Sequence, residues 1–588
     1  MPKAPVFSSR SRTIAAIFLV IGALFVFRLF YLQVIKHEEY VALARQAQEG
    51  KLTLPATRGT ILARDGQQIV PLVLNEPVYT VFADPHELKD KQKIIDTMKR
   101  IAGGDLEDGF EKRLDNKQSR YVVMARQVTK KQADLIEKEK LFGVGLTPGQ
   151  KRVYPEGTLA ASVLGFVNGE GKGLYGIEGA LNDKLSGVNG MRKSLTDVNG
   201  VPLSVHSAEN ILQPPKNGQN TVLSIDRNIQ AYAEQALQNG LKNAKATKGS
   251  VLVMNPANGK VMAMASFPTY DPAKYYDVPT DQNGVYQNPI VTDPYEAGSG
   301  IKTLTMAAGL NEGAVTPQTT FNNLGYDTID GIKIKNALSN QDLGTTDMTQ
   351  VLQFSLNSGV MFMLKQLGGG QVNYQARQKL YDYFANHYLL NKPTGIEQTN
   401  EVTGSMFSPD DEQGNNVRYA TMSFGQGFTV TMLRAATAFS SIINGGTMYK
   451  PTLVDGIEDA NGTFIESQAV IEKANVVTPE TSATIRSMIH DARSRLKYTN
   501  PSDRPGYYIG GKSGTSQTID PATGKYREDN TIATYTGFGG NETPKYVVMI
   551  RIVDSKLPGF GGTVAAQPIF ADISNWLLEY MRIPPVKQ

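Results

Sequence analysis

Three short motifs in the second half of the sequence combine hydroxyl, amine and amide side chains. The first places Ser299 three residues before Lys302, and the second places Ser355 two residues before Asn357. The third begins at Lys512 and reads Lys-Ser-Gly-Thr. A serine hydroxyl is a weak nucleophile until a base removes its proton, and no histidine stands near Ser299. Residues three apart share one face of a helix, which predicts that Lys302 is that base.

A lysine base must be neutral, and an ordinary lysine at pH 7 costs about 4.6 kcal/mol to deprotonate. Burial or a second cation lowers this cost, and Lys512 supplies that cation if the fold brings it close. Gly298 indicates a tight entry into a helix. Ser299 would then stand at the helix N-terminus, where partial positive charge favours a developing anion.

The Ser-x-x-Lys motif alone is weak evidence, because Ser494 and Lys497 repeat its spacing in a charged stretch typical of a protein surface. The Ser-x-Asn motif is less specific still, and the Lys-Ser-Gly motif is more specific than either. The three motifs together, in this order within one predicted domain, favour a serine acyl-transfer enzyme. A competing pattern, Gly506 to Ser513, matches the phosphate-binding G-x-x-x-x-G-K-S sequence. We expect no nucleotide there, since the residues on both sides of Lys512 predict extended chain rather than a helix beginning at the lysine.

The elements that must position these motifs follow a linker at residues 213–218. A short strand at 220–225 leads to Asp226, which is predicted to cap a helix. Strands at 250–254 and 260–264 flank Asn258-Gly259, the favoured sequence for a two-residue hairpin turn. Another strand at 546–553 and a last helix around 569–580 complete an α+β domain, predicted to span residues 214–588.

The region before the linker, residues 36–213, carries no catalytic motif. Its sequence predicts a helix at 39–48, an extended segment at 58–66 and a charged helix at 88–100. We interpret it as a separate pedestal or dimerisation-type domain.

The N-terminus contains a mostly apolar stretch at residues 14–35, and about 20 apolar residues span a bilayer as a helix. Arg28 is tolerated near the outer end, where its side chain reaches the interface. No small-x-small cleavage site follows, so we expect a retained anchor at 13–35 rather than a cleaved signal. Lys3, Arg10 and Arg12 predict a cytoplasmic tail at 1–12 and an exported catalytic domain.

Composition excludes several other functions. The chain has 60 basic and 56 acidic residues, and this near balance gives no electrostatic case for nucleic-acid binding. There are no cysteines, so disulfides and thiolate chemistry are excluded, and the five histidines show no metal-ligand spacing. We expect neither a metal nor a cofactor.

With these motifs, the sequence resembles the class B penicillin-binding proteins, the FtsI-like peptidoglycan D,D-transpeptidases. The resemblance implies the penicillin-binding transpeptidase fold and extends over nearly the whole chain. It includes the segments 58–66, 176–178, 185–187, 425–427, 444–446 and 565–570. The sequence departs from the family pattern at Ala63, Ala297 and Gly300, and none of these changes removes a catalytic atom.

The resemblance also implies a role for each motif residue. Ser299 attacks the carbonyl between the two D-alanines of a peptidoglycan stem peptide, and Lys302 accepts its proton. Ser355 and Asn357 relay protons and orient the substrate amide. The terminal carboxylate is held by the third motif, which comprises Lys512, Ser513, Gly514 and Thr515. Backbone N–H groups of Ser299 and Thr515 form the oxyanion hole, and β-lactams acylate the same serine.

A non-catalytic pedestal implies a partner, an FtsW-type lipid-II polymerase, together with division or elongation proteins. The compact pedestal favours a septal role. Two alternatives stay open: a D,D-carboxypeptidase or β-lactamase on the same fold, and a catalytically silent scaffold of the division or elongation machinery. Neither the acceptor amine nor the stem-peptide composition follows from the sequence.

Overall fold

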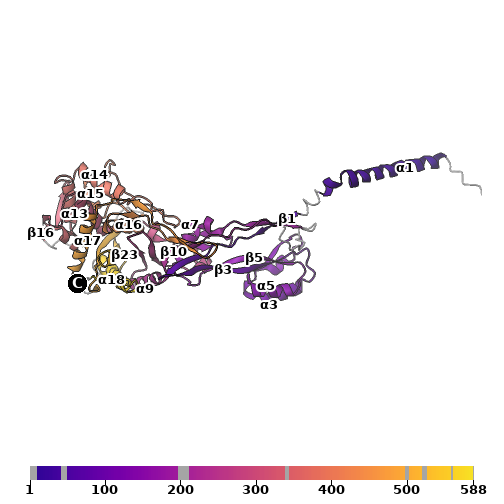
Figure 1. The fold of residues 1–588 in the computed structure, drawn as a ribbon, viewed down its shortest axis with the longest axis horizontal. Coiled ribbons are helices and arrows are strands. Elements are labelled where there is room, and N and C mark those ends of the chain that lie inside the picture. Colours follow the sequence, from indigo (N-terminus) through magenta and orange to yellow (C-terminus); the bar gives the residue numbers. More distant parts are fainter. Residues whose placement is uncertain are drawn as a thin grey trace, which may run out of the picture. The chain divides into compact units, whose positions relative to one another are not determined.

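The computed structural model describes residues 9–41, 49–195, 211–337, 343–496, 502–519, 526–557 and 561–586. The chain divides into two compact units. The first comprises residues 1–57 and 187–217, and the second comprises residues 58–186 and 218–588. Figure 1 shows both units coloured along the sequence.

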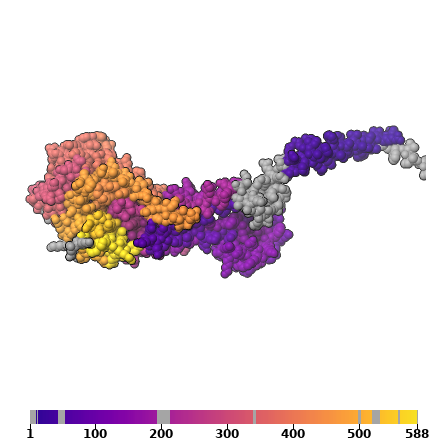
Figure 2. All heavy atoms as spheres, viewed as in Figure 1, coloured from indigo at the N-terminus to yellow at the C-terminus, as the bar shows by residue number. Residues whose placement is uncertain are grey.

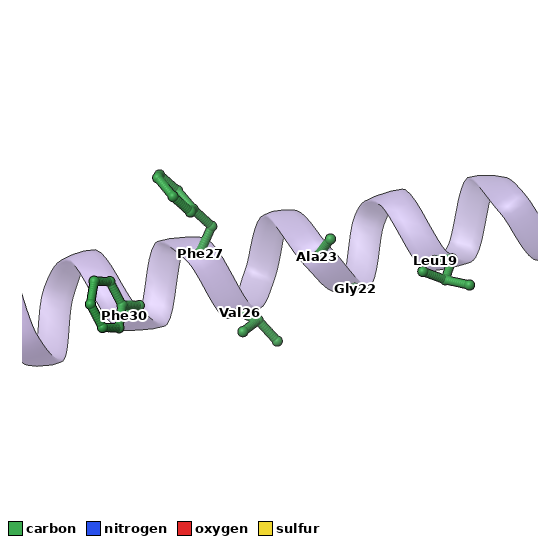
Figure 3. Close-up of a pocket in the computed structure, with 6 residues that line it drawn as sticks. All are labelled: Leu19, Gly22, Ala23, Val26, Phe27 and Phe30. Atoms are coloured by element: carbon green, nitrogen blue, oxygen red, sulfur yellow. The ribbon is translucent and has the colours of Figure 1, made fainter.

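The first unit contains an apolar helix and a small sheet. Helix α1 (Ser9–Phe30) continues as a π-helical turn, Tyr31–Ile35, and the segment Arg12–Ile35 is long and apolar enough to cross a membrane. Its side chains project outward without burial, as Figure 3 shows for Phe27 and Phe30, and Figure 2 shows the helix surface. Exposed phenylalanines repeated along one helix are costly in water and are typical of a lipid-facing helix.

The sheet of the first unit has three antiparallel strands. Its order is β1 (Glu49–Leu54), β8 (Gly190–Leu195) and β9 (Ile211–Gln213). The predicted helix at 39–48 lies mostly outside the described residues, which resume at residue 49.

In the second unit a long sheet joins segments far apart in sequence. Its strands are β19 (Phe464–Glu466), β18 (Val454–Glu458), β10 (Asn220–Asp226), β2 (Ile61–Asp65), β3 (Gln68–Ala83) and β4 (Val122–Thr129), with β5 (Val144–Val153) also paired to β3. Strand β2 lies parallel to β10, and Arg64 on β2 forms an ion pair with Asp455 on β18. The sheet therefore runs across the predicted boundary at residue 213, and that boundary stays a prediction.

Strands β3, β4 and β5 carry a small helical layer (Figure 1). The helices are α3 (Lys91–Ala102), α4 (Phe110–Arg113) and α5 (Lys130–Lys138). Asp90 caps α3, and Thr129 caps α5 with a reciprocal capping box, so both helix starts satisfy backbone N–H groups locally. The charged helix predicted at 88–100 is confirmed as α3.

A five-stranded antiparallel sheet forms the centre of the second unit. Its order is β12 (Val261–Phe267), β11 (Lys248–Met254), β23 (Pro544–Val553), β22 (Tyr526–Gly540) and β21 (Gly510–Ile519). Val251 and Val253 pack toward one core and Leu252 and Met254 toward another, because successive side chains point to opposite faces. A strand buried on both faces explains the unbroken apolar run in β11.

Helices cover both faces of this sheet. One face carries α9 (Arg227–Ala244) and α18 (Gln567–Tyr580), which is yellow in Figure 2. The other face carries α11 (Lys302–Asn311), α16 (Met432–Ile443) and α17 (Pro479–Ser494). Asp226 caps α9 by accepting from two backbone N–H groups, as predicted.

The predicted hairpin is confirmed, because β11 and β12 pair antiparallel, but its predicted two-residue turn is wrong. Strand β11 ends at Met254 and β12 begins at Val261, so the connection is longer than Asn258-Gly259. Asn255 N donates to Lys260 O at 2.9 Å, and Gly259 N donates to Asn255 O at 3.0 Å. The loop folds on its own backbone, and Gly259 supplies its left-handed conformation, with φ 76°.

The remaining elements are short or surround the motifs. Two strand pairs and two helices lie around the second motif. The pairs are β13 (Thr320–Asn323) with β16 (Gly344–Asp347) and the hairpin β14 (Tyr326–Ile329) with β15 (Ile332–Lys335), and the helices are α12 (Met348–Gln353) and α13 (Asn357–Leu367). The others are α6 (Ala161–Leu164), α7 (Gly176–Ala180), α8 (Asn182–Ser186), α10 (Pro289–Thr292), α14 (Tyr374–Asp382), α15 (Asn416–Met422), β6 (Phe166–Val167), β7 (Gly173–Leu174), β17 (Met448–Tyr449) and β20 (Ile471–Lys473).

Candidate active site

Ser299 lies in a tight turn at the start of a buried helix. The 3-10 turn Gly298–Ile301 leads directly into α11, and Ser299 itself is half-buried. Gly298 has φ 59°, and a Cβ at this position would lie 2.5 Å from the carbonyl oxygen of Thr515. Glycine is therefore required here for both the backbone conformation and the close approach of the facing strand. The tight helix entry predicted from Gly298 is confirmed.

Lys302 is fully buried one turn beyond Ser299. Its Nζ donates to Ser355 O at 2.5 Å, to Asn357 Oδ1 at 2.7 Å and to Ser355 Oγ at 3.2 Å. Burial lowers the pKa of the Lys302 amine well below its usual value, and the nearby Lys512 charge lowers it further. The structure thus supplies both conditions under which a lysine becomes a base.

Ser355 joins the two lysines. It occupies the connection between α12 and α13 with φ 58°, a left-handed conformation that costs a non-glycine residue about 1–2 kcal/mol. Its Oγ lies 3.2 Å from Lys302 Nζ and 3.0 Å from Lys512 Nζ. A hydroxyl between two amines can accept from one and donate to the other, which is the geometry of a proton relay.

Lys512 reaches this cluster from the edge strand β21. Its Nζ also donates to Ser513 O at 3.0 Å, and burial lowers the pKa of Lys512 to about 7. Alternation along the strand places Ser513 and Thr515 on the opposite face from Lys512. A Cβ at Gly514 would lie 2.7 Å from Ala297 O and 3.1 Å from the backbone nitrogen of Gly300, so glycine lets β21 pass against the Ser299 turn.

Two further segments singled out in the sequence support this turn. Gly298 N donates to Gly425 O at 3.0 Å, and buried Glu296 accepts from Gly427 N at 2.7 Å. Gly562 N donates to Thr515 Oγ1 at 3.2 Å, just before the start of α18. Glu296 was not identified from the sequence, because a single acidic residue beside a motif carries no distinguishing pattern.

The N-terminal signature segments form a separate buried cluster. Glu178, fully buried on α7, accepts from Arg58 Nε at 2.7 Å and from Arg152 Nε at 2.6 Å. No motif residue belongs to this cluster, so its contribution is to the fold.

The phosphate-loop alternative fails on local structure. Lys512 lies within β21, whereas a phosphate loop needs a helix beginning at its lysine. In the described part of the chain, no group of three or more His, Asp or Glu side chains is arranged to hold a metal ion.

Two family models match the chain. The model described as "Penicillin binding protein transpeptidase domain" matches residues 249–575, and "Penicillin-binding Protein dimerisation domain" matches residues 53–223. The first match includes all three motifs.

Several known proteins are similar over most of their length. "Stage V sporulation protein D" of Bacillus subtilis (strain 168) is 31% identical over 97% of this chain and 85% of its own length. "Peptidoglycan D,D-transpeptidase FtsI" of Escherichia coli (strain K12) is 28% identical over 95% of this chain and 89% of its own.

Solved structures share the fold. Penicillin Binding Protein 2X from Streptococcus thermophilus aligns with a TM-score of 0.73 at 22% identity, covering 91% of this chain and 80% of that one. A peptidoglycan synthetase from Bifidobacterium adolescentis ATCC 15703 aligns with a TM-score of 0.70 at 23% identity, covering 92% of this chain and 98% of that one. The predicted α+β transpeptidase fold with an N-terminal domain is confirmed.

Proposed function

Because the chain belongs to the class B penicillin-binding proteins and is a serine-type peptidoglycan D,D-transpeptidase, we propose that Ser299 is its nucleophile. The observation that carries this assignment is the convergence of Lys302 and Lys512 on the Ser355 hydroxyl, beside the turn that holds Ser299. The family membership gives the reaction, and the proposal assigns its steps to residues.

In the first step, neutral Lys302 takes the proton of Ser299, and Oγ attacks the carbonyl carbon of the penultimate D-alanine. The oxyanion accepts hydrogen bonds from the backbone N–H groups of Ser299 and Thr515, an interaction typically worth about 3–4 kcal/mol. The C–N bond then breaks. Ser355 passes its proton to the departing D-alanine amine and takes a proton from Lys302, which becomes neutral again, while the stem peptide stays esterified to Ser299.

In the second step, an amine of a neighbouring stem peptide attacks the ester carbonyl. Lys302 takes the amine proton, the C–O bond breaks and Ser299 regains its hydrogen. A new amide links the two peptides, so the reaction conserves the number of amide bonds. A β-lactam would follow only the first step, because its leaving group remains tethered in the site.

Substrate binding is assigned to the third motif and to Asn357. The hydroxyls of Ser513 and Thr515 would hold the terminal carboxylate from one face of β21, and the Lys512 ammonium would attract its charge from the other face. Gly514 gives room for the strand to approach. One Nδ2 hydrogen of Asn357 would bind the substrate amide carbonyl. The charged form of Lys512 is required for this role, while Lys302 must be neutral.

The location and cellular role are also proposals. Helix α1 would anchor the chain with its N-terminus in the cytoplasm, because basic residues precede the apolar segment. The catalytic domain would then work outside the membrane, partnered by an FtsW-type lipid-II polymerase. We favour septal synthesis; depletion in the source cell should give filaments, and rounded cells would instead indicate elongation.

The test uses the full chain in detergent with a peptide ending in D-Ala-D-Ala and an amine acceptor, followed by mass spectrometry. Ser299→Ala should abolish the cross-linked product. Ser494→Ala is the matched control, since Ser494 begins the second Ser-x-x-Lys sequence and its hydroxyl donates to Asp491 O on α17. Hydrolysed peptide without cross-linking would indicate a carboxypeptidase, and no turnover by a folded parent would indicate a scaffold.

A further inference from the structure

The side-chain amide of Asn357 is held on both sides. Its Nδ2 donates to the backbone oxygen of Lys335 at 2.9 Å, and its Oδ1 accepts from Lys302 Nζ at 2.7 Å. A carbonyl oxygen can only accept, so the amide nitrogen must face Lys335 and the amide oxygen must face Lys302. The Lys335 carbonyl therefore selects the amide orientation that the reaction needs.

Lys335 ends the β14–β15 hairpin, whose tip is exposed. A two-stranded hairpin by itself is only marginally stable. At its base, two nearly fully buried asparagines close the loop: Asn336 Nδ2 donates to Asn323 Oδ1 at 3.2 Å, and Gly325 N donates to the same oxygen at 3.0 Å. Asn336 N also donates to Gly325 O at 2.9 Å.

The same asparagines hold the start of α13. Ser358 is buried, its backbone N–H donates to Asn336 Oδ1 at 2.9 Å, and its Oγ donates to Asn323 Oδ1 at 2.9 Å. The N-cap residue Leu356 offers no side-chain cap, so Asn336 supplies the cap from the hairpin. The consecutive residues Lys335 and Asn336 thus bond the consecutive residues Asn357 and Ser358.

We propose that Asn336, supported by Asn323 and Ser358, is a positioning residue of the transpeptidase reaction. It fixes the Lys335 carbonyl against the Asn357 amide and so sets both the acceptor for Lys302 and the donor for the substrate. The inference rests on the proposed function, because it assigns Asn336 an effect that passes through Asn357. Fully bonded polar groups define one geometry where apolar packing would tolerate several.

The test is a double-mutant cycle on the full chain, with the rate of acylation by a fluorescent penicillin as readout. Asn336→Ala should lower the second-order rate about 10- to 100-fold, the range expected for a displaced reacting group. In an Asn357→Ala background the same change should cost less than about twofold, because residues that act as a unit are not additive. Independent, multiplicative losses would overturn the inference.

A second readout separates positioning from folding. The rising, acidic side of the plot of acylation rate against pH should shift to lower pH in Asn336→Ala and equally in Asn357→Ala, because protonated Lys302 loses an acceptor in both variants. Asn373→Ala is the matched control, because Asn373 caps α14 by accepting from Ala376 N and donates to Gly368 O. The variant loses comparable hydrogen bonds and should keep both the acylation rate and its pH dependence.

Two outcomes must be kept apart. If Asn336→Ala shows no cooperative unfolding transition, Ser358→Ala replaces it, since it removes only the hydroxyl bond to Asn323 and should still lower the rate severalfold. An unchanged rate in folded Ser358→Ala and Asn336→Ala would overturn the inference alone. An unchanged rate in Asn357→Ala would instead contradict the proposed function.

Discussion

The Lys512 charge should control the pH at which the enzyme begins to work. Both amines lie within 3.2 Å of Ser355 Oγ, so Lys302 Nζ and Lys512 Nζ are at most about 6 Å apart. Two unit charges at about 6 Å repel by about 3 kcal/mol at an effective dielectric constant of about 20, which corresponds to roughly 2 pKa units. Burial is the larger cause of the lowered Lys302 pKa, and this repulsion adds to it.

Lys512→Met removes the charge while keeping an unbranched side chain of similar length. The acylation rate should rise with pH as Lys302 loses its proton. A higher Lys302 pKa therefore moves this rising part of the pH–rate profile, its acidic limb, to higher pH. We expect a shift of about 2 pH units, because about 6 Å is the largest separation that the two contacts to Ser355 Oγ allow, and a shorter one would repel more strongly. The maximal acylation rate will also fall, because the carboxylate loses the Lys512 charge. The pH at which the rate rises, rather than its maximum, therefore reports the Lys302 pKa.

The assay measures the second-order rate of acylation by a fluorescent penicillin across the acid range, on the full chain in detergent. Lys512→Arg is the control, because it retains a cation and should keep the parent's acidic limb. A Met variant whose limb coincides with the parent's would refute the reasoning. It would mean that burial alone makes Lys302 neutral.

Three further outcomes are expected. Gly298→Ala should abolish acylation, because its Cβ would lie 2.5 Å from the facing strand. A Cβ at Gly300 would meet nothing within 4 Å, so Gly300→Ala should keep its activity and gain about 0.5 kcal/mol in the free energy of thermal unfolding. An active Gly298→Ala beside an inactive Gly300→Ala would contradict the turn geometry. Glu178→Gln should lower the free energy of urea unfolding by about 3–5 kcal/mol, since it removes the carboxylate that pairs with Arg58 and Arg152. An unchanged urea concentration at the unfolding midpoint would show that this cluster does not stabilise the fold. The pKa of Lys512 is about 7 in the folded chain and about 10.4 when unfolded, so the unfolded chain binds more protons between these values and the parent's stability should rise with pH there. Lys512→Met should show a smaller rise in Tm over the same range, and an equal rise would mean that another group causes it.

Much of the site was predictable because its residues lie in short local patterns. The tight entry that Gly298 implies is present, and the 3-10 turn that contains Ser299 leads directly into the helix that begins at Lys302. The capping role of Asp226 and the apolar anchor are equally local, since they depend on neighbours within one turn or one continuous run.

What the sequence did not reveal depends on distant contacts. Nothing around Asn323 or Asn336 distinguishes a buried asparagine from an ordinary turn residue, because their partners on α13 lie more than 20 residues away. The parallel pairing of β2 with β10 joins segments about 160 residues apart and has no local signal. The hairpin turn was mispredicted because Asn258-Gly259 satisfies the two-residue pattern, while Asn255 and Lys260 close a longer loop.

The central claim is that Ser299 becomes the acyl-enzyme, and intact-protein mass spectrometry after treatment with penicillin tests it most directly. The parent should gain the mass of one penicillin, and peptide mapping should locate that mass on the peptide containing Ser299. Ser299→Ala should gain none, while Ser494→Ala should behave as the parent. An adduct that persists in Ser299→Ala, or maps to another residue, would contradict the account.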